Sequence, residues 1–266
     1  MSNLIITHPG KSHFDEFCAV SLILGYHKDT DFVVERREPK ESEIENPEIW
    51  VVDIGNEHNP KLKNFDHHQD LSISVSFVLV ADYLQLTESL SKLSFWSFKD
   101  HMDRFGPMKV AKSLGVENLD ETHSPIEVWM LEMFENNISE TISLMRNFGI
   151  SLIDRANELS KQLKFWEECE KIRIKDQVVI IGLTENTKGI EDYIKSMEHP
   201  ASICVTYDNR GDGWKIRRHN DFPGVDFSTL EDNSDIQFAH KGGFIAKTNH
   251  KISRERLLEL IELGIS

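Results

Sequence analysis

The chain has 266 residues, enough for one large or two modest domains with a buried core. Hydrophobic residues at 39% and charged residues at 28% are typical of a globular protein and not of a disordered chain. The formal net charge of −15 argues against broad adhesion to duplex DNA or to an anionic membrane, and no apolar run approaches the ~20 residues of a membrane helix.

The first residues, "MSNLIITHPG", do not combine a basic start with an apolar core and a cleavage site, as a secretion signal does. Three cysteines, Cys18, Cys169 and Cys204, are scattered without metal-knuckle spacing. Each is expected to be a small buried apolar residue in a reducing compartment. We therefore expect a cytoplasmic protein.

The N-terminal part of the chain alternates strand and helix signals. Residues 3–8 form an apolar run that ends in a polar residue, and residues 14–27 repeat apolar side chains at helical spacing. Residues 31–37 and 49–55 predict two further short strands. This order predicts an open parallel α/β sheet, in which ligands bind beyond the carboxyl ends of the strands.

Strand signals are absent between about residues 74 and 171, where helical periodicity dominates. Strands return at residues 176–184, 202–208, 213–220 and 236–244, and residues 253–263 predict a last helix. We therefore predict an α/β fold with a parallel-sheet domain and helical block over residues 1–170, and a smaller α/β domain over residues 171–266.

Histidines and acids gather where the predicted N-terminal elements end. They are His8, His13, Asp15, Asp53, Asp66, His67 and His68, with Asp100 and Asp103 in "FKDHMDRFGP". Imidazole and carboxylate together suit Mn²⁺ best, with Zn²⁺, Co²⁺ and Mg²⁺ as alternatives. Six or more such groups are what two ions about 3.5–4 Å apart require, with a carboxylate bridging them.

These motifs carry a family resemblance. The blocks "THPGKSHFDE", "VVDIG…NP…FDHHQ" and "FAHKGGFIAKT" resemble, in content and order, the DHH phosphoesterase superfamily. The closest resemblance is to the melanocyte-proliferating-gene family of DHH exonuclease-like proteins. It implies a DHH-type catalytic domain followed by a smaller DHH-associated substrate-binding domain.

The resemblance also implies a role for each motif residue. The implied metal ligands are His8, His13, Asp15, Asp53, His67 and Asp103, with Asp53 bridging two ions. Asp66 would orient His67, and His68 would face the scissile phosphate. Asp100 competes with Asp103 for its role, and the family pattern favours Asp103. His13 stands where the wider superfamily has an aspartate, which disfavours Mg²⁺.

In the C-terminal domain, glycine-rich and basic residues are expected to bind the substrate. They are Arg218, His219, His240, Lys241, Gly242 and Gly243. The glycines let backbone N–H groups approach an anion. Strand alternation sends Arg217 and His219 to one face and Arg218 to the other, and Arg218 is the favoured anion contact.

Five other histidines are expected to be packed or solvated without a ligand role: His27, His58, His123, His199 and His250. His101 is expected to lie at a solvated helix end.

The leading hypothesis is a two-metal phosphoesterase that cleaves phosphodiester bonds in nucleotides or short oligonucleotides. Its partner would be a small phosphate compound or a short single-stranded nucleic acid, not duplex DNA or a membrane. The alternatives are a pyrophosphatase or exopolyphosphatase, a non-catalytic module that senses a nucleotide or metal, and a mononuclear zinc amidohydrolase. The sequence does not decide between a monomer and a homodimer.

Overall fold

The computed structural model describes residues 3–117, 119 and 124–266. It divides into two compact units, Met1–Glu158 and Leu159–Ser266. This division precedes the predicted boundary at 170/171 and falls inside helix α8 (Ile138–Glu168). No change of pattern marks it in the sequence, because one continuous helix supplies residues to both units.

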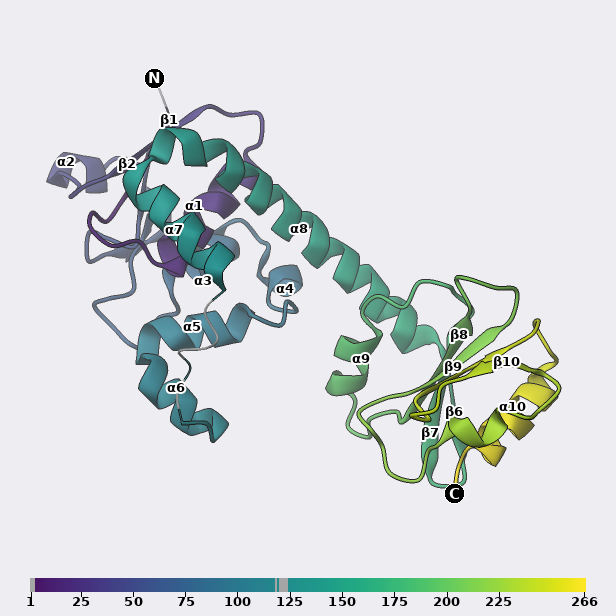
Figure 1. Cartoon of the computed structure of the whole chain (residues 1–266). Coiled ribbons are helices and arrows are strands. Elements are labelled where there is room, and N and C mark those ends of the chain that lie inside the picture. The colour runs from purple at the N-terminus through teal and green to yellow at the C-terminus, as the bar shows by residue number, and fades with distance from the viewer. Residues whose placement is uncertain (1–2, 118, 120–123) are drawn as a thin grey trace. The chain divides into compact units, whose positions relative to one another are not determined.

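The N-terminal unit, in which Figure 1 labels β1 and β2, contains a five-stranded sheet in the order β2-β1-β3-β5-β4. Its strands are β1 (Asn3–Thr7), β2 (Phe32–Arg36), β3 (Ile49–Val52), β4 (His58–Asn59) and β5 (Asn64–Phe65). The pairs β1–β2, β1–β3 and β3–β5 are parallel, and only the β4–β5 pair is antiparallel. The predicted parallel α/β arrangement is thus confirmed, and the carboxyl ends of β1, β3 and β5 lie next to one another.

The predicted first helix is α1 (Phe14–Tyr26), and it is buried on nearly all sides. Its apolar residues Phe17, Val20 and Leu24 lie in the core. Arg146 of α8 donates hydrogen bonds to the carbonyl oxygens at and beyond its end, those of Leu24, His27, Lys28 and Thr30. A cation at this position suits the negative end of the helix dipole.

The predicted helical region is a series of separate helices. They are α3 (Ser76–Tyr83), α4 (Thr87–Leu90), α5 (Trp96–Phe105), α6 (Pro107–Leu114), α7 (Pro125–Asn136) and α8. The unit also has a short helix α2 (Glu41–Ile44) and a 3-10 turn η1 (Pro60–Leu62). Among the described residues, no helix combines the length and apolar character needed to cross a membrane.

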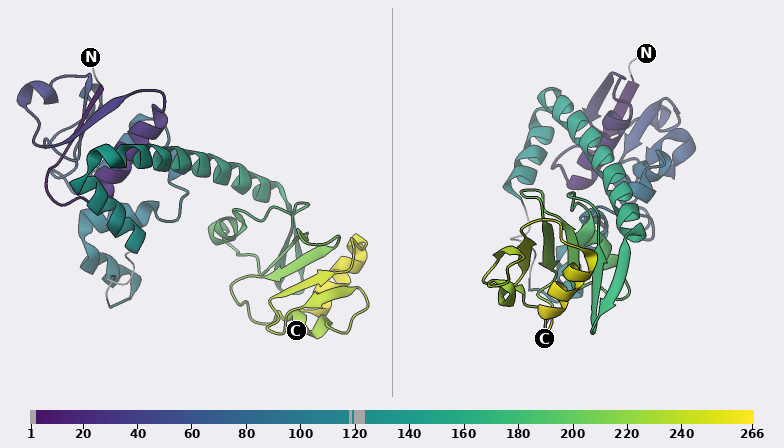
Figure 2. Two further views of the ribbon diagram at one scale, coloured as in Figure 1. Left: turned by 45° about the horizontal axis from the view of Figure 1, so that its top comes forward. Right: turned by 90° about the vertical axis from the view of Figure 1, so that its right-hand side faces the viewer.

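The C-terminal unit contains a six-stranded mixed sheet (Figure 2). In spatial order its strands are β10 (Ile236–Ala239), β11 (Ile245–Thr248), β9 (Trp214–Arg218), β8 (Ile203–Tyr207), β7 (Gln177–Ile181) and β6 (Glu170–Ile174). Only the β7–β8 pair is parallel. Strand β6 was not predicted, because it follows α8 almost directly and no turn residues separate the two in the sequence. The predicted smaller α/β unit is otherwise confirmed.

Two helices cover opposite faces of this second sheet. Helix α10 (Arg254–Leu263) packs against Val179 and Val205, whereas α9 (Ile190–Ser196) and Trp166 pack against Ile180. A 3-10 turn, η3 (Phe227–Leu230), lies on the α10 side. Successive side chains of β7 therefore point to opposite faces of the sheet and pack into two different hydrophobic clusters.

Helices α1 and α8 approach each other closely through two glycines. A Cβ atom on Gly149 would lie 1.8 Å from the carbonyl oxygen of Ser21, and one on Gly25 would lie 2.5 Å from the backbone of Gly149. Backbone atoms cannot move aside as a flexible side chain does, so only glycine fits at both positions.

We expect Gly149→Ala to lower the free energy of unfolding of the full chain by about 1–3 kcal/mol, because the added methyl overpacks a helix crossing. Urea unfolding followed by circular dichroism measures this change. Asn147→Ala, on the exposed face of the same helix, is the control and should change stability little. Equal effects of the two substitutions would contradict the role assigned to the crossing.

Candidate metal centre

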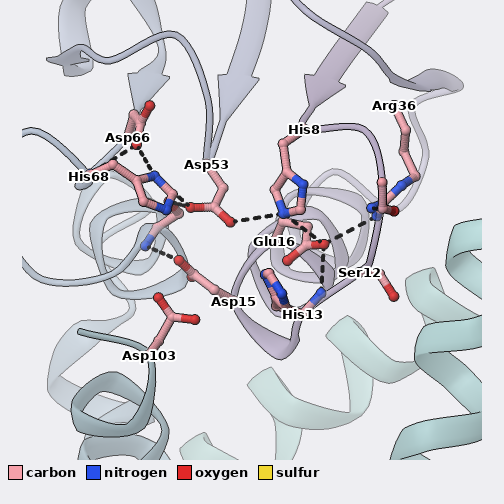
Figure 3. A network of polar contacts seen from close by, with 12 residues as sticks. His8, Ser12, His13, Asp15, Glu16, Arg36, Asp53, Asp66, His68 and Asp103 are labelled. Atoms are coloured by element: carbon pink, nitrogen blue, oxygen red, sulfur yellow. Dashed lines mark hydrogen bonds and ion pairs between the residues drawn. The ribbon is translucent and has the colours of Figure 1, made fainter. Parts of the chain in front are cut away.

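The polar residues predicted at strand ends converge at one edge of the first sheet (Figure 3). His8 follows β1, Asp53 follows β3, and Asp66 and His67 follow β5. Helix α1 adds His13, Asp15 and Glu16 at its start, and α5 adds Asp103. Parallel strands end at the same edge, which brings residues distant in sequence together.

One cluster surrounds His67, which is buried. Its Nε2 atom lies 3.3 Å from Asp15 Oδ2, 3.4 Å from Asp53 Oδ1 and 3.3 Å from Asp103 Oδ2. Neither ring nitrogen forms a hydrogen bond of acceptable geometry within the described chain. Two ligands held at right angles about 2.1 Å from one ion are about 3 Å apart. The spacing therefore fits ligands of a shared ion, and two groups around His67 can hold a metal: Asp15, His67 and Asp103, and Asp53, His67 and His68.

A second cluster contains His8. Its Nε2 lies 3.2 Å from Glu16 Oε1 and 3.5 Å from Asp53 Oδ2, and its ring centroid is 5.3 Å from that of His13. Its Nδ1 is 2.8 Å from the carbonyl oxygen of Pro9, which leaves Nε2 as the atom able to bind an ion. His8, His13 and Glu16 can together hold a metal.

Asp53 joins the two clusters, since Oδ1 faces His67 and Oδ2 faces His8. Its backbone φ of 59° lies in the left-handed region, and Oδ1 also accepts a hydrogen bond of 3.2 Å from Ser76 Oγ. Left-handed backbone outside glycine is uncommon and gathers at functional sites. The geometry is that of a carboxylate able to bridge two ions.

Asp15 is held by the start of helix α3. Its two oxygens accept hydrogen bonds from the N–H groups of Ser76 at 2.9 Å and Phe77 at 2.6 Å. The positive end of a helix dipole stabilises a buried carboxylate of this kind. The position of Asp15 is thus fixed by an element far along the chain.

Glu16 is a candidate ligand that the sequence analysis missed. It is fully buried, Oε1 accepts hydrogen bonds from the His13 N–H at 2.8 Å and from Arg36 at 3.2 Å, and Oε2 has no hydrogen-bond partner within the described chain. The signal was the glutamate three residues after His13, a spacing typical of a helix start.

The predicted pairing of Asp66 with His67 is wrong. Asp66 Oδ1 lies 2.7 Å from His68 Nδ1 and accepts the His68 N–H at 3.1 Å, while Oδ2 accepts the Asn56 N–H at 2.7 Å. The carboxylate folds back onto the residue two positions later, as aspartate often does in turns. Asp66 therefore orients His68.

Asp100 and Asp103 lie on the same helix, α5, but have different partners. Asp100 accepts a hydrogen bond from the Val75 N–H at 3.2 Å and forms an ion pair with Arg104. Asp103 faces His67. The structure thus brings Asp103 and not Asp100 to the cluster. His101, beside Asp100, is exposed.

The charged groups of the centre perturb one another. Glu16 is the main cause that raises the pKa of His8 to about 9. Burial alone would lower the pKa of His67, but the carboxylates of Asp103, Asp15 and Asp53 close to its Nε2 atom raise it to about 12. Burial raises the pKa of Asp15 and of Asp53, and like-charge repulsion adds to it, from Asp53 and Asp103 on Asp15 and from Glu16 and Asp103 on Asp53. Crowded buried carboxylates of this kind favour a bound cation.

The pKa values of Asp66 and His68 shift in opposite directions. Burial would raise the pKa of Asp66, but hydrogen bonds from His68 and Asn56 lower it to about 2. The same bond is the main cause that raises the pKa of His68. Asp66 therefore favours the protonated form of the His68 ring.

The predicted substrate residues of the C-terminal unit already have partners within that unit. Arg218 donates to the carbonyl oxygens of Val225 at 2.7 Å and Gly242 at 3.4 Å and to Asp221 at 2.9 Å. As alternation predicts, Arg217 and His219 share the other face, where both contact Glu191 at 3.1 Å. His219 is buried, and burial lowers its pKa.

The glycine-rich turn joins β10 to β11. The Gly242 N–H donates to His240 Nδ1 at 2.9 Å, and the Gly243 N–H donates to the His240 carbonyl at 2.8 Å. Lys241 forms an ion pair with Glu231 at 2.6 Å, and Gly243 has a φ of 68° that suits glycine. An anion bound here would have to replace these contacts, so the role of these residues stays a prediction.

Of the histidines expected to have no ligand role, His27 and His58 pack beside aromatic rings, and His199 and His250 are exposed. His123 lies outside the described residues.

Comparisons with known proteins give a family match and a structural match. Residues 4–75 match the profile of MYG1_exonuc, described as an uncharacterised protein family (UPF0160). The crystal structure of RecJ in complex with Mn²⁺ from Thermus thermophilus is 12% identical, with a TM-score of 0.28. The match covers 97% of this chain and 51% of the RecJ chain, so this chain spans about half the length of that protein. A TM-score this low does not itself define the fold. No curated protein matches the sequence.

The fold and the clusters define an α/β protein with candidate metal ligands at the carboxyl ends of parallel strands. Over residues 4–75 the chain is similar to the MYG1_exonuc family, the segment that contains the first motifs. The matched segment contains the ligand candidates from His8 to His67 and ends before Asp103 and the C-terminal unit.

Asp100 and Asp103 provide a matched pair of variants. We expect Asp103→Asn to weaken Mn²⁺ binding at one site by at least about 100-fold, because it removes a charged oxygen from the His67 cluster. Asp100→Asn should lower stability without changing the Mn²⁺ affinity, because Asp100 contacts Arg104 and a backbone N–H. Titration calorimetry on the full chain measures both affinities, and a reversed order would contradict the assignment.

Proposed function

We propose that the N-terminal unit is a divalent-metal-dependent phosphoesterase that hydrolyses phosphodiester bonds in nucleotides or short oligonucleotides. The observation that carries the proposal is the placement of Asp53 between two clusters, one oxygen toward each. A carboxylate shared in this way suits a pair of ions that together hold a phosphoryl group. The family match, whose name denotes an exonuclease, supports the same reaction class.

The residues present fit two divalent ions. Asp15, His67 and Asp103 would hold one, His8, His13 and Glu16 the other, and Asp53 both. Mixed imidazole and carboxylate donors favour Mn²⁺, with Zn²⁺, Co²⁺ and Mg²⁺ as alternatives. When bound, such ions lower the pKa of a water and offset the charge that develops on phosphoryl oxygens.

His68 is the residue proposed to contact the phosphate. Its side chain is 59% exposed, and it lines a cavity of about 520 Å³ together with His8, His13 and Asp53. Because Asp66 holds Nδ1, Nε2 is the ring nitrogen that remains to donate to a phosphate oxygen. A protonated imidazole there would stabilise the negative charge of the transition state.

We expect the Mn²⁺-loaded full chain to hydrolyse bis-p-nitrophenyl phosphate, and Asp53→Asn to reduce this activity below detection because both clusters lose a shared charge. A cyclic dinucleotide, a 3′-labelled short RNA and pyrophosphate, tested in parallel, separate the alternatives. Release of phosphate from pyrophosphate alone would replace the proposal by a pyrophosphatase. Equal slow turnover by wild type and variant would indicate a binding module.

We expect His68→Gln to lower kcat by about 10²-fold while Mn²⁺ affinity stays within about twofold, since the exposed ring donates to substrate and not to an ion. Asp66→Asn should lower kcat in the same direction but less, because it removes only the orienting contact. Steady-state kinetics and calorimetry measure the two quantities. A loss of Mn²⁺ binding in His68→Gln would show that His68 is a ligand instead.

A further inference from the structure

A second cavity, of about 600 Å³, lies on another side of the same ligands. It is formed by the first turn of α1 together with α5 and α7, all within the N-terminal unit. Its lining includes His13, Asp15 and Asp103. A molecule whose phosphate lies at the ligand clusters could therefore extend directly into this cavity.

One wall of the cavity is apolar and firmly supported. Phe14 packs edge-on against Phe77 and Phe95, with ring centroids 5.9 Å and 5.8 Å away. Met102 and Leu131 add aliphatic surface. Lys99 Nζ lies over the Phe14 ring, 4.6 Å from its centroid, and the neighbouring Met102 and Leu131 leave apolar surface that suits a flat ring system in the substrate.

The charged groups of the lining disfavour a second phosphate. Glu127, Glu132 and Glu135 line the cavity together with two cations, Lys11 and Lys99, of which Lys99 is already paired with Glu127. A further phosphoryl group would meet these carboxylates, whereas a neutral ring that carries N–H donors would not. Glutamate accepts hydrogen bonds well from the exocyclic amino group of a base.

We propose that this cavity binds the nucleobase of the nucleotide whose phosphate lies at the ligand clusters, and that it prefers bases with an exocyclic amino group. The inference rests on the proposed function and names its substrate class. In this proposal, α5 and α7 make the site bind the end of a nucleotide in preference to a polyphosphate.

Val128 and Ile126 on α7 provide the test. Val128 lines the cavity and is 43% exposed, so that tryptophan can replace it and fill the cavity without burial in the core. Ile126 is 73% exposed on the same helix outside the lining, and Ile126→Trp is the matched control. Circular dichroism checks that both variants are folded.

Calorimetry with the Mn²⁺-loaded full chain compares adenosine 5′-monophosphate with ribose 5-phosphate, which lacks the base. We expect wild type and Ile126→Trp to bind the nucleotide about tenfold more tightly, the size of one lost stacking contact. Val128→Trp should abolish this preference while its affinity for ribose 5-phosphate stays the same. Uridine 5′-monophosphate should bind wild type more weakly than the adenine nucleotide.

Equal affinities of wild type for the nucleotide and ribose 5-phosphate would overturn the inference, as would an equal loss of both in Val128→Trp. Hydrolysis of bis-p-nitrophenyl phosphate tests the proposed function separately. Turnover of that diester without a base preference would leave the phosphoesterase standing and remove only the base site. A base preference without any turnover would keep the base site and overturn the phosphoesterase.

Discussion

The two oxygens of Asp53 are the constraint on which the N-terminal unit depends, because each must face a different set of ligands. The parallel order of β1, β3 and β5 meets this requirement by ending three neighbouring strands at His8, Asp53 and the Asp66–His67 pair. Helix α1, which starts at the same edge, brings Asp15 to His67 and Glu16 to His8. The sheet therefore positions one carboxylate in addition to contributing to the hydrophobic core.

Gathering this many charges in a buried place is costly, and the unit offsets the cost locally. The start of α3 donates two N–H groups to Asp15, and Arg36 at the end of β2 donates to Glu16. These contacts satisfy only part of the carboxylate charge, since Glu16 Oε2 and both nitrogens of His67 have no hydrogen-bond partner within the described chain. Buried polar atoms without a hydrogen-bond partner are what ligands positioned to bind cations would show.

Much of the fold and of the candidate centre could be predicted from the sequence, where local pattern carried the information. Strands such as residues 49–55 combine apolar runs with a polar end, and motif order pointed to His8, Asp53, His67 and Asp103. Glu16 was missed because its side chain reaches the centre only through the tertiary position of α1. The partner of Asp66 was mistaken because a turn, and not strand direction, sets it. The unit boundary inside α8 leaves no mark in composition.

The left-handed backbone at Asp53 also affects how this position is expected to change in evolution. A non-glycine residue at a φ of 59° costs stability, on the order of 1 kcal/mol, which glycine would recover. A lineage that lost the need for its reaction would therefore gain robustness by exchanging this one residue. Related chains that no longer catalyse the reaction should therefore differ at position 53 first from those that still do.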